Sequence, residues 1–93
     1  MNRYHKKFMK KILDSDMNEM DKDDILRELS RTHRIMMNYE RTNERELLKL
    51  YHYGIEHLYK LLELATEDEK LVQELKKLAF NGVEYDKIKN YYY

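Results

Sequence analysis

The 93-residue chain has no cysteine, no proline and only two glycines. Without cysteine it can form neither disulfides nor zinc–thiolate sites, and it has no thiol for catalysis. The scarcity of glycine and proline leaves little material for the tight turns of β-hairpins and sandwiches, which favours an all-α fold. The chain also lacks the run of about 20 apolar residues that spans a bilayer and the apolar core of a secretion signal. We therefore expect a soluble, cytoplasmic protein that does not associate with membranes.

What the chain does contain is enough apolar material for a single helical domain over residues 1–93. Its residues are 42% hydrophobic and 39% charged, a balance typical of a globular rather than a disordered protein. The net charge is zero, but the charges are segregated. Residues 1–13 contain five Lys or Arg and no acidic residue, and residues 14–24 contain six Asp or Glu and one Lys. Electrostatic steering of a partner is therefore expected to be local.

The spacing of apolar residues predicts four helices and, from them, a compact bundle of four to five helices. The first helix is basic and amphipathic, with an apolar line formed by Tyr4, Phe8 and Ile12. The second is expected to begin with Asp21 as its cap and to bury one face, which consists of Ile25, Leu29, Thr32, Met36 and Tyr39. Around residues 38–46 two alternatives stay open: a break with Asn43 as a cap, or a helix that continues into the third.

The segment Leu47–Ala65 is expected to form the central helix of the bundle. One stripe on it consists of Leu48, Tyr51, Ile55, Leu58, Leu62 and Ala65. A second stripe beside it consists of Leu47, Leu50, Gly54, Leu61 and Leu64. Together they cover about 200° of the helix, more than the roughly 100° that one buried face requires. So broad an arc predicts more than one neighbour and leaves a homodimer open, and Gly54 inside it is expected to mark a close helix crossing.

The fourth helix has the most distinct predicted ends. Thr66 and Glu69 have the spacing of a capping box. The core face is expected to consist of Leu71, Val72, Leu75, Leu78 and Ala79. Gly82 is placed to end the helix in a left-handed conformation. Residues 83–93 are either a short fifth helix or an extended tail, and the pattern does not decide between them.

The acidic stretch from Asp14 to Asp24 begins with the Asp-x-Asp-x-Asn pattern of a calcium loop. The match ends there, because the position of the turn glycine holds Glu19 and the position of the bidentate glutamate holds Ile25. Without these two parts the loop loses its sharp turn and its strongest ligand. We interpret the stretch as an acidic corner between two basic helices, whose mutual repulsion the carboxylates reduce.

Catalytic and metal-binding patterns are weak. His52 and Glu56 have a chelating spacing but are expected on the solvated side of the third helix. His33 and His57 are expected to flank the core, where they could form a metal or general-base site with Glu40 or a tyrosine, although a hydrogen-bonded core histidine is the commoner role. The two serines have no glycine-flanked elbow, and there is no phosphate-binding glycine loop. We therefore expect no enzyme, no metal and no cofactor.

The arginines provide the sharper signal, because all six lie in the first half of the chain. If the second and third helices were continuous through residue 46, five of them would fall within about 80° of one line. These five are Arg27, Arg31, Arg34, Arg41 and Arg45. Arginine suits bidentate contact with carboxylate or phosphate, so the stripe could engage an acidic protein surface or a nucleic-acid backbone, or be a plain solvated face. Zero net charge and the acidic corner weaken the nucleic-acid alternative.

Tyrosine and methionine are abundant, with nine and six residues. Both types are enriched at protein interfaces, and Met36, Met37, Tyr91 and Tyr92 are the best candidates here, although AT-rich coding DNA favours the same residue types without any need for binding. We predict a small non-enzymatic regulator or inhibitor that binds another macromolecule, first of all a protein. The alternative is a nucleic-acid binder that uses the arginine stripe and the basic first helix. In size and class alone, without any motif, the chain is similar to small regulators that phages and other mobile elements encode.

Overall fold

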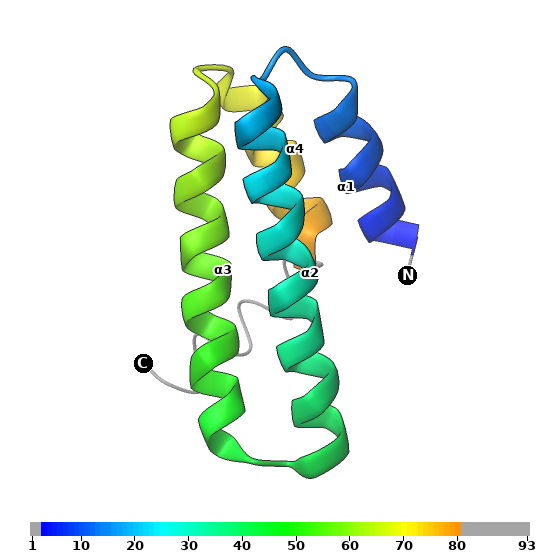
Figure 1. Cartoon of the computed structure of the whole chain (residues 1–93), viewed down its shortest axis with the longest axis vertical. Helices are drawn as coiled ribbons and strands as arrows, with labels where there is room; N and C mark the ends of the chain where they lie inside the picture. Colours follow the sequence, from blue (N-terminus) through cyan, green and yellow to red (C-terminus); the bar gives the residue numbers. More distant parts are fainter. Residues whose placement is uncertain (1–2, 81–93) are drawn as a thin grey trace.

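The computed structural model describes residues 3–80, without the side chains of residues 3, 4 and 80. This part of the chain forms four helices, α1 (Arg3–Leu13), α2 (Glu19–Thr42), α3 (Arg45–Ala65) and α4 (Glu69–Phe80), and contains no strand (Figure 1). The predicted all-α class is confirmed. The expected helix end at Gly82 and the fifth helix or tail at residues 83–93 lie outside the described residues.

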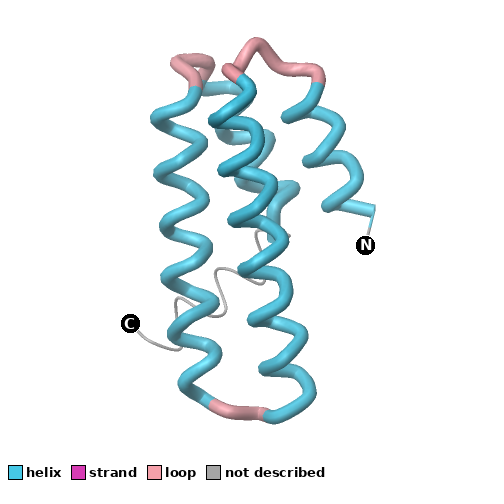
Figure 2. The backbone as a smooth tube through the Cα atoms, viewed as in Figure 1, coloured by secondary structure: helices cyan, strands magenta, loops and turns pink. Residues whose placement is uncertain are grey.

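The long helices α2 and α3 form an antiparallel hairpin, and the shorter α1 and α4 lie beside one half of it (Figure 2). At 1.5 Å per residue, α2 and α3 are about 36 and 31 Å long, whereas α1 and α4 reach only about 17 and 18 Å. The most extensive contact joins α2 to α3, and the next joins α1 to α4; smaller contacts of α3 with α4 and of α1 with α2 close the ring. One end of the hairpin therefore belongs to a four-helix bundle, and the other consists of α2 and α3 alone among the described helices.

The core fills the four-helix half and takes side chains from all four helices. The largest fully buried ones are Phe8, Ile12, Ile25, Thr32, Tyr51, Ile55, Leu58, Leu62 and Leu75. The predicted apolar line of α1 is confirmed at Phe8 and Ile12, and that of α2 from Ile25 to Thr32. The face predicted for α4 is confirmed as well. Met36 and Tyr39 are half-buried, because they lie farther along α2, toward the two-helix end.

The buried face of α3 is turned relative to the prediction. Its first stripe is buried from Leu48 to Leu62, but Leu50 and Leu64 of the second stripe are 49% and 85% exposed. The buried face extends instead to His52, which is 5% exposed, so the expectation that His52 is solvated is wrong. The buried residues of α3 span about 160°, so the predicted arc of about 200° is too wide. The direction in which α2 and α4 lie sets this face, and the period of α3 alone does not encode it.

Gly54 marks a close crossing of α2 and α3. A Cβ atom built on Gly54 would lie 2.9 Å from Cγ2 of Thr32 and still closer to Oγ1 of the same side chain. Thr32 is fully buried on α2. Because glycine has no side chain, it lets the two helices approach this closely. The predicted helix crossing at Gly54 is confirmed.

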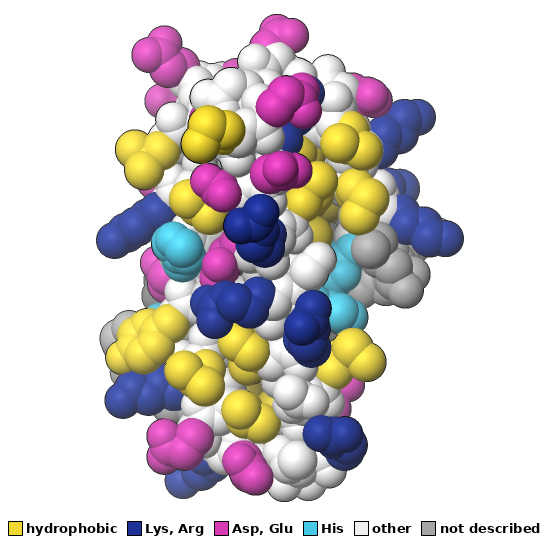
Figure 3. Space-filling view, viewed as in Figure 1, with side chains coloured by type: hydrophobic (Ala, Val, Ile, Leu, Met, Phe, Trp, Pro, Cys, Tyr) yellow, Lys and Arg dark blue, Asp and Glu magenta, His cyan; other side chains and the backbone are white. Residues whose placement is uncertain are grey.

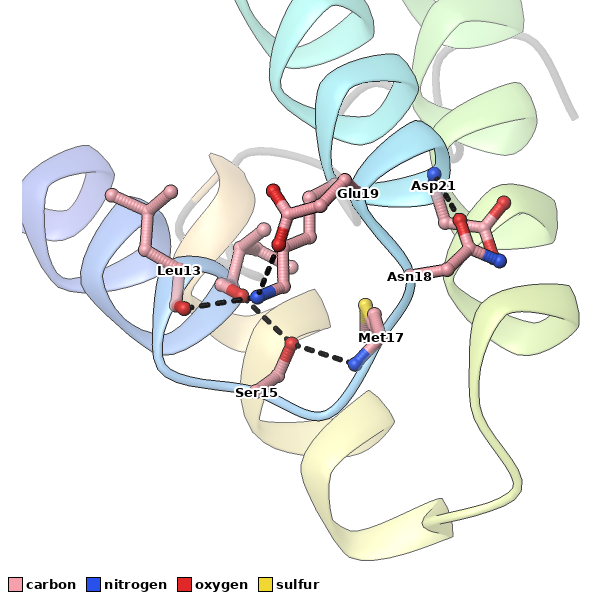
Figure 4. Close-up of polar contacts among 8 residues, drawn as sticks. Leu13, Ser15, Met17, Asn18, Glu19 and Asp21 are labelled. Carbon is pink, nitrogen blue, oxygen red and sulfur yellow. Dashed lines mark hydrogen bonds and ion pairs between the residues drawn. The ribbon is translucent and has the colours of Figure 1, made fainter.

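The acidic stretch forms the corner between α1 and α2 (Figure 4). Oγ of Ser15 donates to the carbonyl of Ile12 at 2.7 Å and accepts from the amide of Met17 at 3.4 Å. Met17 is buried in the core. Nζ of Lys22 donates to the carbonyl of Leu13 at 3.1 Å and so ties the start of α2 to the end of α1. These hydrogen bonds hold the corner between the two helices in shape.

The first turn of α2 corrects one predicted cap. The helix begins at Glu19 and its cap is Asn18, whose Oδ1 accepts from the amide of Asp21 at 2.8 Å. The predicted cap at Asp21 is therefore wrong. The cap lies three residues earlier, at Asn18, and its side chain accepts from the free amide of Asp21 itself. A twelve-residue calcium loop that started at Asp14 would have its second half inside α2, which supports the interpretation of a helical corner.

The hairpin connection between α2 and α3 settles the alternatives at residues 38–46. α2 ends at Thr42, and Asn43 takes a left-handed φ of 58° while its amide donates to the carbonyl of Tyr39 at 2.7 Å. A break at Asn43 is confirmed. However, Asn43 ends α2 and does not start α3, whose preceding residue Glu44 makes no side-chain cap.

The connection between α3 and α4 corrects a second cap. Oδ1 of Asp68 accepts from the amide of Leu71 at 3.1 Å, so Asp68 caps α4. Thr66 follows the last turn of α3, and its Oγ1 accepts from the amide of Asp68 at 3.2 Å. The capping box predicted for Thr66 and Glu69 is therefore wrong, because Thr66 stabilises the connection and the nearer Asp68 takes the cap.

Candidate functional site

Four of the predicted arginines lie on one exposed line of α2, which we call the arginine face (Arg27, Arg31, Arg34 and Arg41). At 100° per residue they fall within about 80° of one another. Figure 3 shows basic side chains grouped over the middle of α2, at the front of the molecule. Arg45 does not belong to this line, because the chain reverses at Asn43 and Arg45 begins α3. The line of five arginines was predicted for a continuous helix; because α2 ends at Thr42, that condition is not met and Arg45 lies off the line.

Arg31 is held by a carboxylate of its own helix. Its Nη2 donates to Oε1 of Glu28 at 2.7 Å, and its Nε donates to Oε2 at 3.4 Å. Nδ1 of His57, on α3, lies 3.4 Å from the same Oε2. Glu28 is only 9% exposed, whereas Arg31 and His57 are largely exposed. Glu28 therefore links the two helices at the edge of the core.

The electrostatics of this cluster favour its ionised form. Burial by itself would raise the pKa of Glu28, but the hydrogen bond and charge of Arg31, followed by those of His57, outweigh it and hold the pKa below its ordinary value of 4.5. The hydrogen bond to Glu28 raises the pKa of Arg31. The positive charge of Arg31 is thus largely compensated by Glu28 within the chain. The i, i+3 spacing of Glu28 and Arg31 in the sequence indicates such an ion pair, but the prediction considered the arginines alone.

Arg27 and Arg34 are the cations of the arginine face that a partner can reach most directly. Both are exposed, and within residues 3–80 neither forms an ion pair with an acidic side chain. Nη2 of Arg41, near the end of α2, donates to Oδ1 of Asn38 at 3.3 Å. Arg27 and Arg34 therefore lie on either side of the neutralised Arg31.

A groove of about 290 Å³ lies between α1 and α2, and we call it the α1–α2 groove. Met9 from α1 and Leu26, Leu29 and Met37 from α2 line it, and Arg34 stands at its edge. Figure 3 shows hydrophobic side chains gathered at the junction of these two helices. Met37 is 56% exposed, whereas Met36, the other methionine predicted as a contact, is half-buried against the core. Of the predicted Met36–Met37 pair, the structure therefore brings only Met37 to the groove.

Two histidines meet in the α1–α2 groove. The rings of His5 and His33 pack edge to face with centroids 4.7 Å apart. His5 is buried, and its Nε2–H donates to the carbonyl of Ala79 at 2.7 Å, which fastens α1 to α4. Burial lowers the pKa of His5 from its ordinary value of 6.5; the hydrogen bond to Ala79 opposes this, and the nearby His33 adds to it. Sequence reasoning missed His5, although it falls within about 20° of Ile12 on α1.

The two histidines that were expected to flank the core do not come together. His33 is half-buried in the α1–α2 groove, whereas His57 is exposed beside Glu28. The predicted position of His57 at the edge of the core is therefore wrong, because the buried face of α3 is turned toward His52. Glu40, the suggested third member of a metal or general-base site, is exposed.

Within residues 3–80, no three His, Asp or Glu side chains are arranged to hold a metal ion. None of the helices in this part of the chain is long and apolar enough to cross a membrane. Tyr91 and Tyr92, the remaining predicted contacts, lie outside the described residues. Comparison with protein-family models, with curated proteins and with solved structures finds no match for the chain. The candidate site is therefore defined by its own geometry, as the arginine face and the α1–α2 groove beside it.

Proposed function

We propose that the chain is a small non-enzymatic protein that regulates or inhibits another protein by binding it through α2. The observation that carries this proposal is the position of Arg34, an exposed cation without an acidic partner in the described chain, in the lining of an apolar groove on the same helix. Arg27, a second exposed cation without an ion pair in the described chain, lies two turns before it on α2. Arginine and methionine are among the residue types that protein interfaces favour. An arginine line that served only solubility would not need an apolar groove at its edge.

The exposed apolar side chains support the same proposal. A single apolar side chain on the surface of a monomer is ordinary and needs no explanation. Met37, which is 56% exposed, is not isolated, because it shares the α1–α2 groove with Met9 and Leu26. Such a set of apolar side chains beside cations is better explained by contact with a partner. A protein encoded by a phage or another mobile element would in this way block or redirect a protein of its host.

A nucleic-acid backbone is the second candidate, and the lysines of α1 favour it. Lys6, Lys7 and Lys10 are exposed, and the α1 sequence contains no acidic residue. Against it, Glu28 neutralises Arg31, and the acidic corner adjoins the same end of the bundle. Binding to phosphates would weaken steeply with salt and would depend little on sequence, whereas protein binding would show a weaker dependence on salt.

The proposal is tested by capture from a lysate of the cells that encode the protein, with and without nuclease. The bait is the wild-type protein or the double variant Arg27→Glu/Arg34→Glu. The matched control is Lys70→Glu/Lys77→Glu, which makes the same change of charge at two exposed positions of α4. We expect a defined protein that nuclease does not remove, that the control retains and that the arginine variant loses by about tenfold or more. Equal capture by all three baits, or capture that nuclease abolishes, would contradict protein binding through α2.

A further inference from the structure

We infer that the α1–α2 groove receives an acidic amphipathic helix of the partner, whose apolar side chains enter the groove while its carboxylates lie beside the cations on both rims. This inference rests on the proposed function and specifies the chemistry of the partner segment. Helix-in-groove recognition needs an apolar seam of the right period and rims of a complementary charge. The α1–α2 groove supplies both.

The groove follows one line of α2, with an apolar residue at each end and two polar residues between them. Leu26, Ser30, His33 and Met37 line the groove at spacings of four, three and four residues. This spacing keeps a line on one face of a helix over three turns. Met9 lines it from α1. A partner helix with apolar residues at the same period can therefore follow the groove over its length.

The groove stays open because α1 is attached mainly to α4. His5 donates to the carbonyl of Ala79 at 2.7 Å, and Nζ of Lys11 lies 3.0 Å from Oε2 of Glu74. The contact of α1 with α2 is smaller than its contact with α4. Figure 1 shows α1 beside the first half of α2. The bonds to α4 thus fix one wall of the groove without closing it.

Cations stand on both rims of the groove. On the α2 side Arg34 lines the groove, whereas Arg27, two turns before it, lies toward α3 beside Glu28 and His57. On the α1 side Lys6 and Lys10 are exposed, and at 100° per residue both lie within about 100° of Met9. On the same side of α2 the acids lie beyond the two ends of the groove, with Glu19 and Asp23 before it and Glu40 after it, while α1 offers none. These charges favour an occupant whose apolar stripe is flanked by carboxylates.

The same charges disfavour a second copy of this chain as the occupant. In a two-fold symmetric dimer the same patch of each subunit faces its counterpart. The cationic rims of the two copies would then face each other, and like charges across an interface oppose association. A partner with acidic rims meets no such repulsion.

The test uses three fluorescein-labelled, helix-forming peptides of 18 residues and measures binding by fluorescence anisotropy. The acidic peptide carries leucines at the period of the groove and glutamates beside them. A basic peptide keeps the leucines but replaces the glutamates with lysines, and an apolar-null peptide keeps the glutamates but replaces the leucines with glutamines. We expect the acidic peptide to bind at least about tenfold more tightly than either of the others.

Variants of the protein locate the binding. Met37→Glu and Arg34→Glu, both at exposed positions, should each weaken the acidic peptide by about tenfold, and Lys77→Glu on α4 should change its affinity less than about twofold. Backbone NMR spectra of each variant verify the fold, and peptide-induced shifts should cluster on α1 and α2. Equal binding of the three peptides, or shifts confined to α3 and α4, would overturn the inference. Self-association that Met37→Glu abolishes, without peptide binding, would assign the groove to a second copy and would also overturn it.

Failure of the inference can be distinguished from failure of the proposed function. A captured protein that is lost with Arg27→Glu/Arg34→Glu but retained by Met37→Glu would leave the proposed function intact and would refute the groove as its site. If neither variant affects any captured protein, the proposed function itself fails.

Discussion

Replacing Gly54 with alanine should destabilise the protein, although alanine is the better helix former. On propensity alone the change would stabilise α3 by about 1 kcal/mol. The new Cβ, however, would lie 2.9 Å from Cγ2 of Thr32 and closer still to its Oγ1, under the 3.0 Å below which something must shift. Thr32 is fully buried and β-branched, so its side chain has little freedom to move aside. Overpacking costs about 1–3 kcal/mol, and so short a contact belongs to the upper part of this range.

The expected net effect of Gly54→Ala is a loss of about 1–2 kcal/mol in the free energy of unfolding. Urea unfolding followed by helical circular dichroism measures it, and the midpoint of thermal unfolding should fall by roughly 4–16 °C. Adding Thr32→Ala should relieve the clash, so the double variant should be more stable than the sum of the single effects predicts, by about 1 kcal/mol or more. Ser30→Ala, at an exposed position of α2, is the control for the effect of an added alanine. A rise in stability of about 1 kcal/mol in Gly54→Ala would show that the two helices do not cross closely here.

Three further predictions concern His5, Glu28 and Asn43. Burial holds the folded pKa of His5 below the ordinary 6.5, so the unfolded state takes up the proton more readily. The contribution of His5 to the free energy of unfolding should be fully present above pH 6.5 and decline as pH falls through the folded pKa. Urea unfolding between about pH 7.5 and 5 should show a shallower decline for His5→Gln than for the wild type, and parallel declines of the two proteins would contradict this role of His5. Glu28→Gln should lose about 1 kcal/mol near pH 7, because Arg31 loses its charge-assisted hydrogen bonds. Since the folded pKa of Glu28 lies below 4.5, its contribution to the free energy of unfolding is present above that pH and is lost as pH falls through the folded pKa. If the variant loses stability on acidification as steeply as the wild type, the role of the carboxylate is refuted. Asn43→Ala should cost about 1 kcal/mol, because alanine strains at positive φ, whereas Asn43→Gly should be neutral or better; equal stabilities of the two variants would argue against the left-handed turn.

Periodicity predicted the helices well because it reports which residues share a face. The lines at Phe8 and Ile12, and at Ile25 and Thr32, are buried as expected. Gly54 was also informative, since an unfavourable residue inside a long helix needs a packing reason. These features depend on local spacing, which the sequence contains in full.

Helix ends and the direction of packing were less predictable. Asn18 and Asp21 both suit a cap, and Thr66 competes with Asp68 in the same way, so the choice depends on where the chain must turn. At Asn43 the break depends on a left-handed backbone conformation, and the local sequence is also compatible with a continuous helix.

The burial of His52 instead of Leu50 has a similar origin. A helical wheel has no absolute orientation, and the neighbouring helices decide which edge of a broad apolar face is covered. The candidate site shows the same limit: the arginine line on α2 follows from spacing, but the groove beside it depends on α1 being held by α4, through contacts 63 and 74 residues apart in the sequence.

The most direct measurement of the central claim, that α2 is a protein-binding face, is photo-crosslinking in the cells that make the protein. A photoreactive phenylalanine derivative replaces exposed Ser30, which lines the α1–α2 groove, or exposed Lys70 on α4 as the reference position. The account predicts a discrete, nuclease-resistant adduct with one protein from position 30 and none from position 70. Adducts of equal yield at both positions, or an adduct from position 30 that nuclease removes, would contradict it.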